Sequence, residues 1–351
     1  MKSQPTLQRT IWPPFYFFRK YGEECTRVPL GLLLTCTIAA VAKLGADLIG
    51  GSSMLYALLF GCLLNPFFSN RYFQPGINIS AKQILRIGVC LLGARITLDQ
   101  IASLGGQAVL LAILGILFTI TAGLFIAKAL GFQRSFAVVM ASSVAICGAS
   151  AALAVAAVLP KSEQLERETG VTVVGVTVLS TIAMVLYPLA TKLVGYDDLA
   201  SGIFIGATIH DVAQVVAAGY VISDQAGETA TIVKLMRVAF LVPVVACISF
   251  HFSKDETSCT GLSGRRIPFP AFLLGFLLLA AINSSHVVGT HIMEQVAAGS
   301  KYCLLIAVAA IGLKTSFLSL FKTGGRPMLS MTLTTIALAL FSILFLSLFL
   351  T

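Results

Sequence analysis

The stretch that decides the fold reads QRSFAVVMASSVAICGASAALAVAAVL over residues 133–159, and it carries no charge after Arg134. It is long enough for a helix to cross the roughly 30 Å hydrocarbon core of a bilayer. Comparable apolar runs recur from Val28 to the C-terminus, too many to bury in one water-soluble core. The runs are continuous rather than alternating, which excludes a barrel and leaves helices. The sequence therefore predicts an all-α polytopic membrane protein.

The composition supports this class and excludes several functions. Hydrophobic residues make up 57% of the 351 and charged residues 11%, against roughly a quarter charged in a typical soluble domain. The net charge of +9 lies mostly in the N-terminal tail and short loops, without a basic stripe, so we expect no nucleic-acid partner. The eight cysteines are scattered without a CxxC pair, so we expect no disulfide framework, no metal and no cofactor.

The apolar runs predict about 11 transmembrane helices. They cover residues 28–50, 52–66, 78–95, 106–130, 133–159, 169–190, 199–222, 229–252, 269–285, 299–314 and 328–350. With the N-terminus inside, the cytoplasmic tail and loops hold fifteen Lys/Arg and the other side holds three. Because cytoplasmic loops of membrane proteins are enriched in Lys and Arg, we expect a multi-pass protein of the bacterial inner membrane, with a cytoplasmic N-terminus and the C-terminus outside.

The chain divides into two unequal parts. Residues 1–27 are predicted to form a cytoplasmic N-terminal tail, in which Trp12 and the aromatic run 15–18 beside Arg19 and Lys20 act as an interfacial anchor. Residues 28–351 are predicted to form a single transmembrane transporter domain.

One internal repeat is visible at an offset of 219 residues. The segment GARIT (93–97), followed by Gly-Gly at 105–106 and an apolar helix, recurs as GLKTS (312–316), followed by Gly-Gly at 324–325 and another. The predicted topology places the first copy outside and the second inside. Opposed copies of one motif are typical of inverted-repeat transporters. Two similar glycine-containing loops between helices are the alternative reading.

Two of the predicted spans carry polar residues at their centres. Span 133–159 contains small and hydroxylated residues that permit a break in the helix, namely Ser142, Ser143, Cys147, Gly148 and Ser150. Span 199–222 contains Thr208, His210, Asp211 and Gln214 in otherwise apolar sequence. An ionisable residue at that depth is costly, so it usually faces a cavity, a partner or a transport path. The alternatives are a small-residue packing face in the first span and a structural His–Asp pair in the second.

Two basic residues open the eighth predicted span. Lys234 and Arg237 are three residues apart and therefore lie on one helical face. They could attract an anion or pair with Asp211. Alternatively, they extend toward the membrane interface, as long basic side chains near helix ends often do.

The sequence has no motif of a soluble enzyme or an ATP-driven pump. It lacks a Walker A lysine loop, a GxGxxG after a strand, HExxH and GxSxG. We therefore do not expect an enzyme, and gradient-driven carriage or a channel remains.

The central segments resemble a known family. The runs SSVAICGASA (142–151), TIHDVAQVVAAG (208–219) and KLMRV (234–238) are similar to the YeiH-type family of bacterial membrane proteins, often labelled sulfate exporters. The resemblance covers the chain from about residue 28 to its end. Members commonly have Glu where this chain has Asp211. The family is grouped with cation/proton antiporters and bile-acid-type symporters, so the resemblance implies an inverted-repeat fold with two discontinuous helices that cross at mid-membrane.

The resemblance and the residues together lead to one functional hypothesis and two alternatives. The leading hypothesis is a secondary transporter that exports a small anion, sulfate or sulfonate-like, coupled to H⁺ or Na⁺. A cation/proton antiporter of the same fold, with Asp211 as the ion carboxylate, is the first alternative. A membrane-embedded enzyme or receptor component that uses His210 and Asp211 is the second. The expected partners are the small substrate and the lipid bilayer, and a homodimer stays open.

Overall fold

The computed structural model describes residues 14–68, 72–96, 105–160, 162–253, 271–285, 288–315 and 325–349, and every regular element within them is a helix. Six of these helical stretches are long and apolar enough to cross a membrane: Val28–Ile49, Ala108–Ala129, Glu163–Val194, Asp224–Phe252, His291–Lys314 and Arg326–Phe349. Shorter apolar helices of 10 to 17 residues lie between them. The chain is therefore an all-helical, multi-pass membrane protein.

The helices follow one another with short connections. In chain order they are α1 (Pro14–Ile49), α2 (Ser53–Phe68), α3 (Gln74–Ile79), the π-helical turn η1 (Ser80–Ile84), α4 (Leu85–Leu92), α6 (Gly105–Ala129), α7 (Arg134–Ala145), α8 (Ala149–Val158), α9 (Glu163–Val194), α10 (Asp198–Thr208), α11 (Val212–Ile222), α12 (Asp224–Ala239), α13 (Leu241–Ser253), α14 (Ala271–Ser284), α15 (Thr290–Lys314) and α17 (Arg326–Phe349).

Each predicted span overlaps a helix, but several helices begin earlier than the apolar pattern. Helix α9 begins at Glu163 rather than at residue 169, because the Ser162 side chain caps it by accepting from the Leu165 N–H at 3.1 Å. Helix α1 begins at Pro14 and so extends into the predicted tail. Trp12 of the predicted anchor lies outside the described residues, as do parts of both repeat segments, 97–104 and 316–324.

Both polar-centred spans are interrupted, as predicted. In the first, α7 ends at Ala145 and α8 begins at Ala149. In the second, α10 ends at Thr208 and α11 begins at Val212. The residues between them adopt non-helical backbone angles.

The second interruption reverses the chain, so α10 and α11 form a helical hairpin. Along α10, Gly202 lies against Thr229 and Gly206 against Val233, so α10 runs parallel to α12. Along α11, Gly219 lies against Gly227, so α11 runs antiparallel to α12. The two halves therefore return to the same side of the molecule.

The first interruption also reverses the chain. Helix α7 starts beside the end of α13, where Arg134 contacts His251 at 2.5 Å and the ring of Phe252. Helix α8 packs against α13 as well, and α7 and α8 pack against each other and against α9. The prediction is of two discontinuous helices that cross at mid-membrane. Both are discontinuous, but the chain reverses at each break, so each span forms a hairpin. A run of about 25 apolar residues fits one crossing or two half-crossings equally well.

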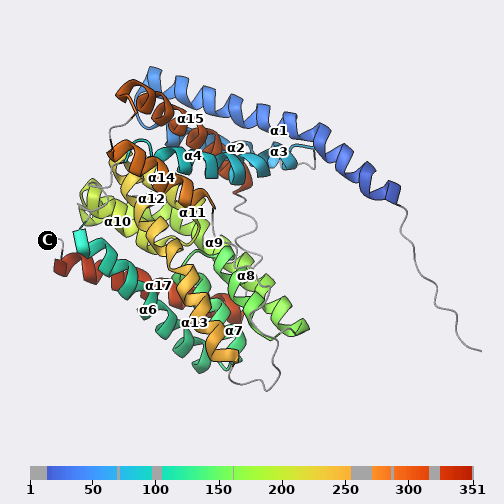
Figure 1. Cartoon of the computed structure of the whole chain (residues 1–351), viewed down its shortest axis with the longest axis vertical. Helices are drawn as coiled ribbons and strands as arrows, with labels where there is room; N and C mark the ends of the chain where they lie inside the picture. The colour runs from blue at the N-terminus through green and yellow to red at the C-terminus, as the bar shows by residue number, and fades with distance from the viewer. Residues whose placement is uncertain are drawn as a thin grey trace, which may run out of the picture.

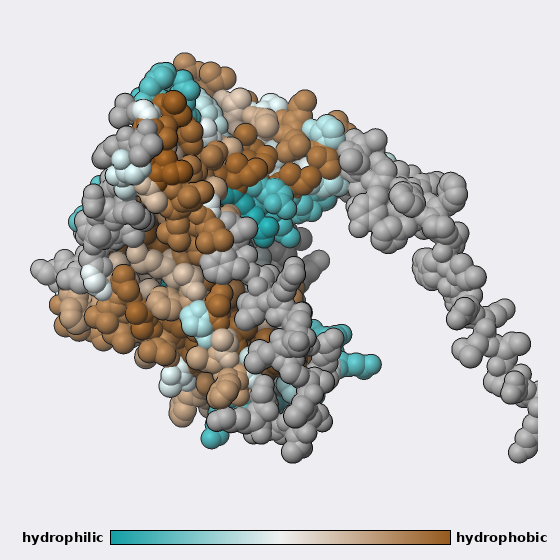
Figure 2. All heavy atoms as spheres, in the orientation of Figure 1, coloured by the Kyte–Doolittle hydropathy of each residue, from teal (hydrophilic) through white to brown (hydrophobic). Residues whose placement is uncertain are grey.

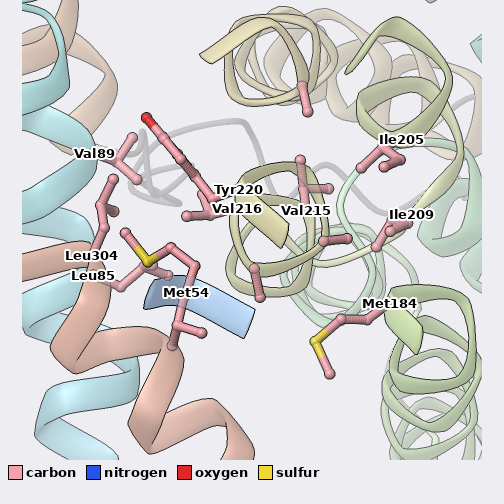
Figure 3. Close-up of a cluster of buried hydrophobic side chains, with 14 of the residues drawn as sticks. Met54, Leu85, Val89, Met184, Ile205, Ile209, Val215, Val216, Tyr220 and Leu304 are labelled. Carbon is pink, nitrogen blue, oxygen red and sulfur yellow. The ribbon is translucent and has the colours of Figure 1, made fainter. Parts of the chain in front are cut away.

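The hairpins lie between two groups of helices. Figure 1 shows α1, α2, α4 and α15 together on one side, and α6, α13 and α17 on the other. Helix α11 is packed on two faces (Figure 3): Val216 and Tyr220 lie toward Met54 and Leu304, while Ile209 lies on the side of α10. The main hydrophobic core joins these elements, so α11 is fixed at the boundary between the two groups.

The outer surface is apolar over much of the molecule. Large side chains exposed on it include Leu48, Leu63, Phe125, Leu193 and Leu348, each at least 68% exposed. Figure 2 shows broad hydrophobic areas on the visible face, with hydrophilic residues gathered in the hollow between the two groups. A water-soluble monomer rarely exposes so much contiguous apolar surface, whereas a bilayer covers it.

Candidate functional site

The tips of the two hairpins meet, and His210 connects them. The side chain is fully buried. Its Nδ1 lies 3.2 Å from the carbonyl oxygen of Val144 in α7, and its Nε2 lies 3.0 Å from the Thr335 hydroxyl of α17. A carbonyl oxygen only accepts, so Nδ1 is the donor there. His210 therefore ties the second hairpin tip to the first and to α17.

Lys234 of α12 bonds to both hairpin tips. Its ammonium group donates to the carbonyl oxygens of Ile146 at 2.6 Å and Ile209 at 2.8 Å. The side chain is fully buried. These two carbonyls directly follow α7 and α10, where the helical hydrogen-bond pattern runs out.

Arg237, about one turn further along α12, also bonds to both hairpin tips. Its Nε donates to the carbonyl oxygen of Ala145 at 3.1 Å, and its two terminal nitrogens reach Val144 at 3.3 Å and Gly206 at 3.4 Å. They also donate to the carbonyls of Ala145 and Ala207. The guanidinium group therefore caps the C-terminal ends of two half-helices at once.

The arrangement explains why two cations can be buried side by side. Helix C-terminal ends carry unpaired carbonyls and a partial negative charge, and cations stabilise them. The sequence analysis left open whether these residues attract an anion, pair with Asp211 or extend to the interface. Both side chains are buried at the centre of the fold, so they do not extend to the membrane interface. Within the described residues, neither forms an ion pair with Asp211.

The N-terminal end of α8 is formed by a glycine turn. Gly148 has φ +60° and ψ −124°, a conformation that side-chain-bearing residues avoid. The Ser143 hydroxyl donates to the Gly148 carbonyl at 2.8 Å, and the Gly148 N–H donates to the Ser143 carbonyl at 2.8 Å. These bonds hold the turn without using a side chain to cap α8. The positive end of the α8 dipole is therefore open.

The N-terminal end of α11 is capped by Asp211. Its carboxylate accepts from the Ala213 N–H at 3.1 Å, and its own N–H donates to the Ser180 hydroxyl of α9 at 3.1 Å. The side chain is half-buried. Asp211 thus combines a local capping role with a position at the tip of the hairpin.

A cavity of about 1150 Å³ opens beside the two tips. From the hairpins it is lined by Cys147, Ala149, Ser150, Asp211 and Gln214. From the facing helices it is lined by Lys82 of η1, Arg86 of α4, and Lys314 and Thr315 at the end of α15. Three cations and one carboxylate therefore face this space, which gives it a positive balance that favours anions.

The structure separates the predicted site residues into two sets. Cys147, Ser150, Asp211 and Gln214 line the cavity. The others, namely Ser142, Ser143, Gly148, Thr208, His210, Lys234 and Arg237, do not line it. Most of this second set hold the turns and tips in place. For example, the Thr208 hydroxyl donates to the carbonyl of Phe204 within α10 at 2.6 Å.

The cavity wall that faces the hairpins was not predicted from the sequence. Lys82 and Arg86 sit four residues apart in an apolar span, which is a signal for a functional site, and it was not used. Lys314 entered the sequence-based prediction only as part of the repeat segment GLKTS (312–316). Thr181 of α9, which accepts from the Gln214 amide at 2.8 Å, carried no signal at all.

Comparison with known proteins finds one matching family model and several relatives of this chain. The family model described as "Conserved hypothetical protein 698" matches residues 30–331. The chain belongs to this family, whose members are named UPF0324 membrane proteins. The expected resemblance to YeiH-type proteins is thereby confirmed.

Relatives of this UPF0324 chain match it over most of their length. A UPF0324 membrane protein of Chlorobaculum tepidum is 46% identical over 311 residues, which cover 88% of this chain and 86% of the relative. The UPF0324 membrane protein TauZ of Paracoccus denitrificans is 44% identical over 313 residues, covering 89% and 92%. A relative in Rhizobium meliloti is 44% identical over 312 residues, covering 89% and 90%. The hairpins and the residues that line the cavity all lie within residues 30–331, which the family model matches.

Proposed function

We propose that this UPF0324 chain is a secondary transporter that exports a small inorganic or sulfonated anion across the bacterial inner membrane. The observation that carries the proposal is the cavity at the hairpin tips. It joins an open helix N-terminus at Ala149 to three cationic side chains, Lys82, Arg86 and Lys314. Helix N-termini and basic side chains are the groups that bind small anions in proteins.

The hairpins suit such a site because of their length. Their halves contain 10 to 12 residues, or about 15–18 Å of helix, which is half of a roughly 30 Å hydrocarbon core. In the proposed topology their tips meet near mid-membrane. Nine segments then cross the bilayer, namely α1, α2, α3 to α4, α6, α9, α12 to α13, α14, α15 and α17.

This topology strengthens the predicted orientation. Because α7 to α8 no longer crosses, Lys161 and Arg167 move to the side of the N-terminal tail, while Lys192 moves to the other side. The excess of Lys and Arg on the cytoplasmic side is then larger than the excess counted from the spans predicted by sequence. A cytoplasmic N-terminus and an external C-terminus remain the proposal.

We also propose an inverted repeat, with the second copy circularly permuted. Two equivalent hydrogen bonds support it. The Asn65 amide of α2 donates to the carbonyl of Leu313 at 2.6 Å, and the Asn283 amide of α14 donates to the carbonyl of Ile96 at 3.3 Å. Each asparagine closes a short helix and meets the repeat segment of the other half. The hairpins also approach from opposite sides, as inverted copies would.

An ion-pair network lies at the end of the molecule opposite to the cavity cations. Arg95 pairs with Glu228 at 2.7 Å and with Asp224 at 3.6 Å, and Lys301 pairs with Asp224 at 2.9 Å. Lys301 is thirteen residues before Lys314, or about 20 Å along α15. In the proposed mechanism these pairs close one side while the cavity is open to the other.

The charge of the cavity favours anion export over cation/proton antiport, because one carboxylate faces three cations. Reconstitution into liposomes tests the proposal: labelled sulfate and ethanesulfonate should exchange across the membrane in the wild type. Lys314→Met should reduce exchange at least tenfold, whereas Lys128→Met, at the exposed end of α6, should leave it unchanged. If neither anion exchanges while Na⁺ does, the proposal is wrong and cation antiport takes its place.

A further inference from the structure

The wall of the cavity formed by α11 presents hydrogen-bond acceptors. Asp211 and Gln214 are three residues apart, so they lie on one face at the start of the helix. Both line the cavity. A carboxylate accepts only, and one oxygen of Asp211 already takes the Ala213 N–H.

The orientation of the Gln214 amide is determined by its neighbours. The Thr181 hydroxyl donates to the carbonyl of Thr177 at 2.9 Å, so its oxygen accepts from the Gln214 Nε2 at 2.8 Å. The amide nitrogen of Gln214 is therefore bonded, and its amide oxygen, Oε1, is left to accept a hydrogen bond. Gln214 is only 6% exposed, and within the described residues Oε1 has no hydrogen-bond donor. A buried acceptor without a donor is destabilising, and such groups in native proteins call for an explanation.

The opposite wall presents donors. Lys82, Arg86 and Lys314 carry donors and no acceptors. Lys314, Lys82 and Asp211 line the same cavity, so a ligand bound there faces both walls.

A ligand that fills the cavity must offer acceptors to the cationic wall and a hydrogen-bond donor to the α11 wall. Sulfate is an acceptor on every oxygen, so it matches the cationic wall but leaves Gln214 Oε1 without a donor and faces the Asp211 carboxylate. An anion with its own donor satisfies both. Sites built to bond a donor reject analogues that lack it, because their buried acceptor stays unpaired.

We infer that the transported anion carries a hydrogen-bond donor, which binds at Asp211 and Gln214 while the anionic group binds at Lys314 and its cationic neighbours. This inference rests on the proposed transport function and narrows its substrate class. Two sources supply the chemistry. One is an oxyanion that keeps a proton near neutral pH, such as hydrogen phosphate or hydrogensulfite. The other is an anion with an ammonium group, such as 2-aminoethanesulfonate.

Two matched pairs of anions test the inference. In proteoliposomes loaded with labelled ethanesulfonate, exchange is measured against external 2-aminoethanesulfonate and external ethanesulfonate, which differ only in the ammonium group. Sulfate and hydrogen phosphate form the second pair. We expect the donor-bearing member of at least one pair to exchange at a concentration at least tenfold lower than its partner, and the pair identifies the source.

Gln214→Leu should remove that preference while the ethanesulfonate exchange continues, which also shows that the variant folds. Gln83→Leu, a glutamine of η1 on the facing wall, should retain the preference. Equal exchange of both members in both pairs, or a preference that survives Gln214→Leu, overturns the inference and leaves anion transport standing. If no anion exchanges at all, the proposed function fails, and the inference fails with it.

Discussion

At the scale of single residues, the buried cations of α12 show how a broken helix can exist inside a membrane protein. Each break leaves carbonyl groups without helical partners, and lipid offers no water to bond them. Lys234 and Arg237 supply the donors to both breaks. One face of α12 therefore stabilises the ends of two half-helices that are far apart in sequence.

Lys234→Met should test this role. The substitution keeps the length of the side chain but leaves the carbonyls of Ile146 and Ile209 unpaired. Lost bonds to a charged donor cost about 1.5–3 kcal/mol each, so we expect a large drop in the thermal unfolding temperature in detergent. Lys128→Met, at an exposed position, should change it little. Equal unfolding temperatures for the two variants would show that Lys234 does not hold the tips together.

Asp211→Asn separates capping from charge. An asparagine oxygen can still accept from the Ala213 N–H, and asparagine is as good a helix N-cap as aspartate. Folding and membrane insertion should therefore be retained. If the carboxylate carries the coupling proton, the variant should lose the dependence of anion flux on the pH gradient, measured in proteoliposomes at several internal pH values. A wild-type pH profile in this variant would contradict proton coupling through Asp211.

At the scale of elements, the sequence correctly predicted where the helices break and failed to predict that the chain reverses there. Small and hydroxylated residues around Gly148, and the polar run from Thr208, mark both breaks. The reversal depends on contacts that local sequence does not show. Gly202 and Gly206 allow α10 to approach α12, and Gly219 allows α11 to return along it. A small-residue spacing indicates close packing but does not name the partner helix.

The hairpin makes a topological prediction that a crossing helix does not share. Single cysteines introduced at Asp198, at the start of α10, and at Gln225, just after α11, are expected to react with a membrane-impermeant maleimide from the same side. Both positions are exposed. Cysteines at Glu163 and Lys192, near the two ends of α9, are the control and should react from opposite sides. Labelling of the first pair from opposite sides would restore the crossing helix.

At the scale of the whole molecule, the proposed repeat relates equivalent charges at opposite ends. Arg95 and Lys314 are 219 residues apart, and so are Lys82 and Lys301. Arg95 and Lys301 are paired with the carboxylates of Asp224 and Glu228. Within the described residues, Lys82 and Lys314 have no such ion pair and line the cavity. The sequence motif predicts the repeat. It does not predict which copy forms ion pairs, because that depends on the conformation of the protein.

This asymmetry predicts that the paired carboxylates control which side of the cavity is open. The double variant Asp224→Asn and Glu228→Gln removes the network that joins α12 to Arg95, just after α4, and to Lys301 in α15. Exposed ion pairs contribute roughly 0–1 kcal/mol each, so the loss of all three should shift the balance between the two proposed open states by up to about 100-fold. Cys147 lines the cavity and reports the shift in a background without the other cysteines. Its reaction with an impermeant maleimide should increase from the Arg95 side and decrease from the Lys314 side. Glu294→Gln removes an exposed carboxylate near the start of α15 and should leave both rates unchanged. If the double variant behaves like this control, the ion pairs hold the helices together without controlling access to the cavity.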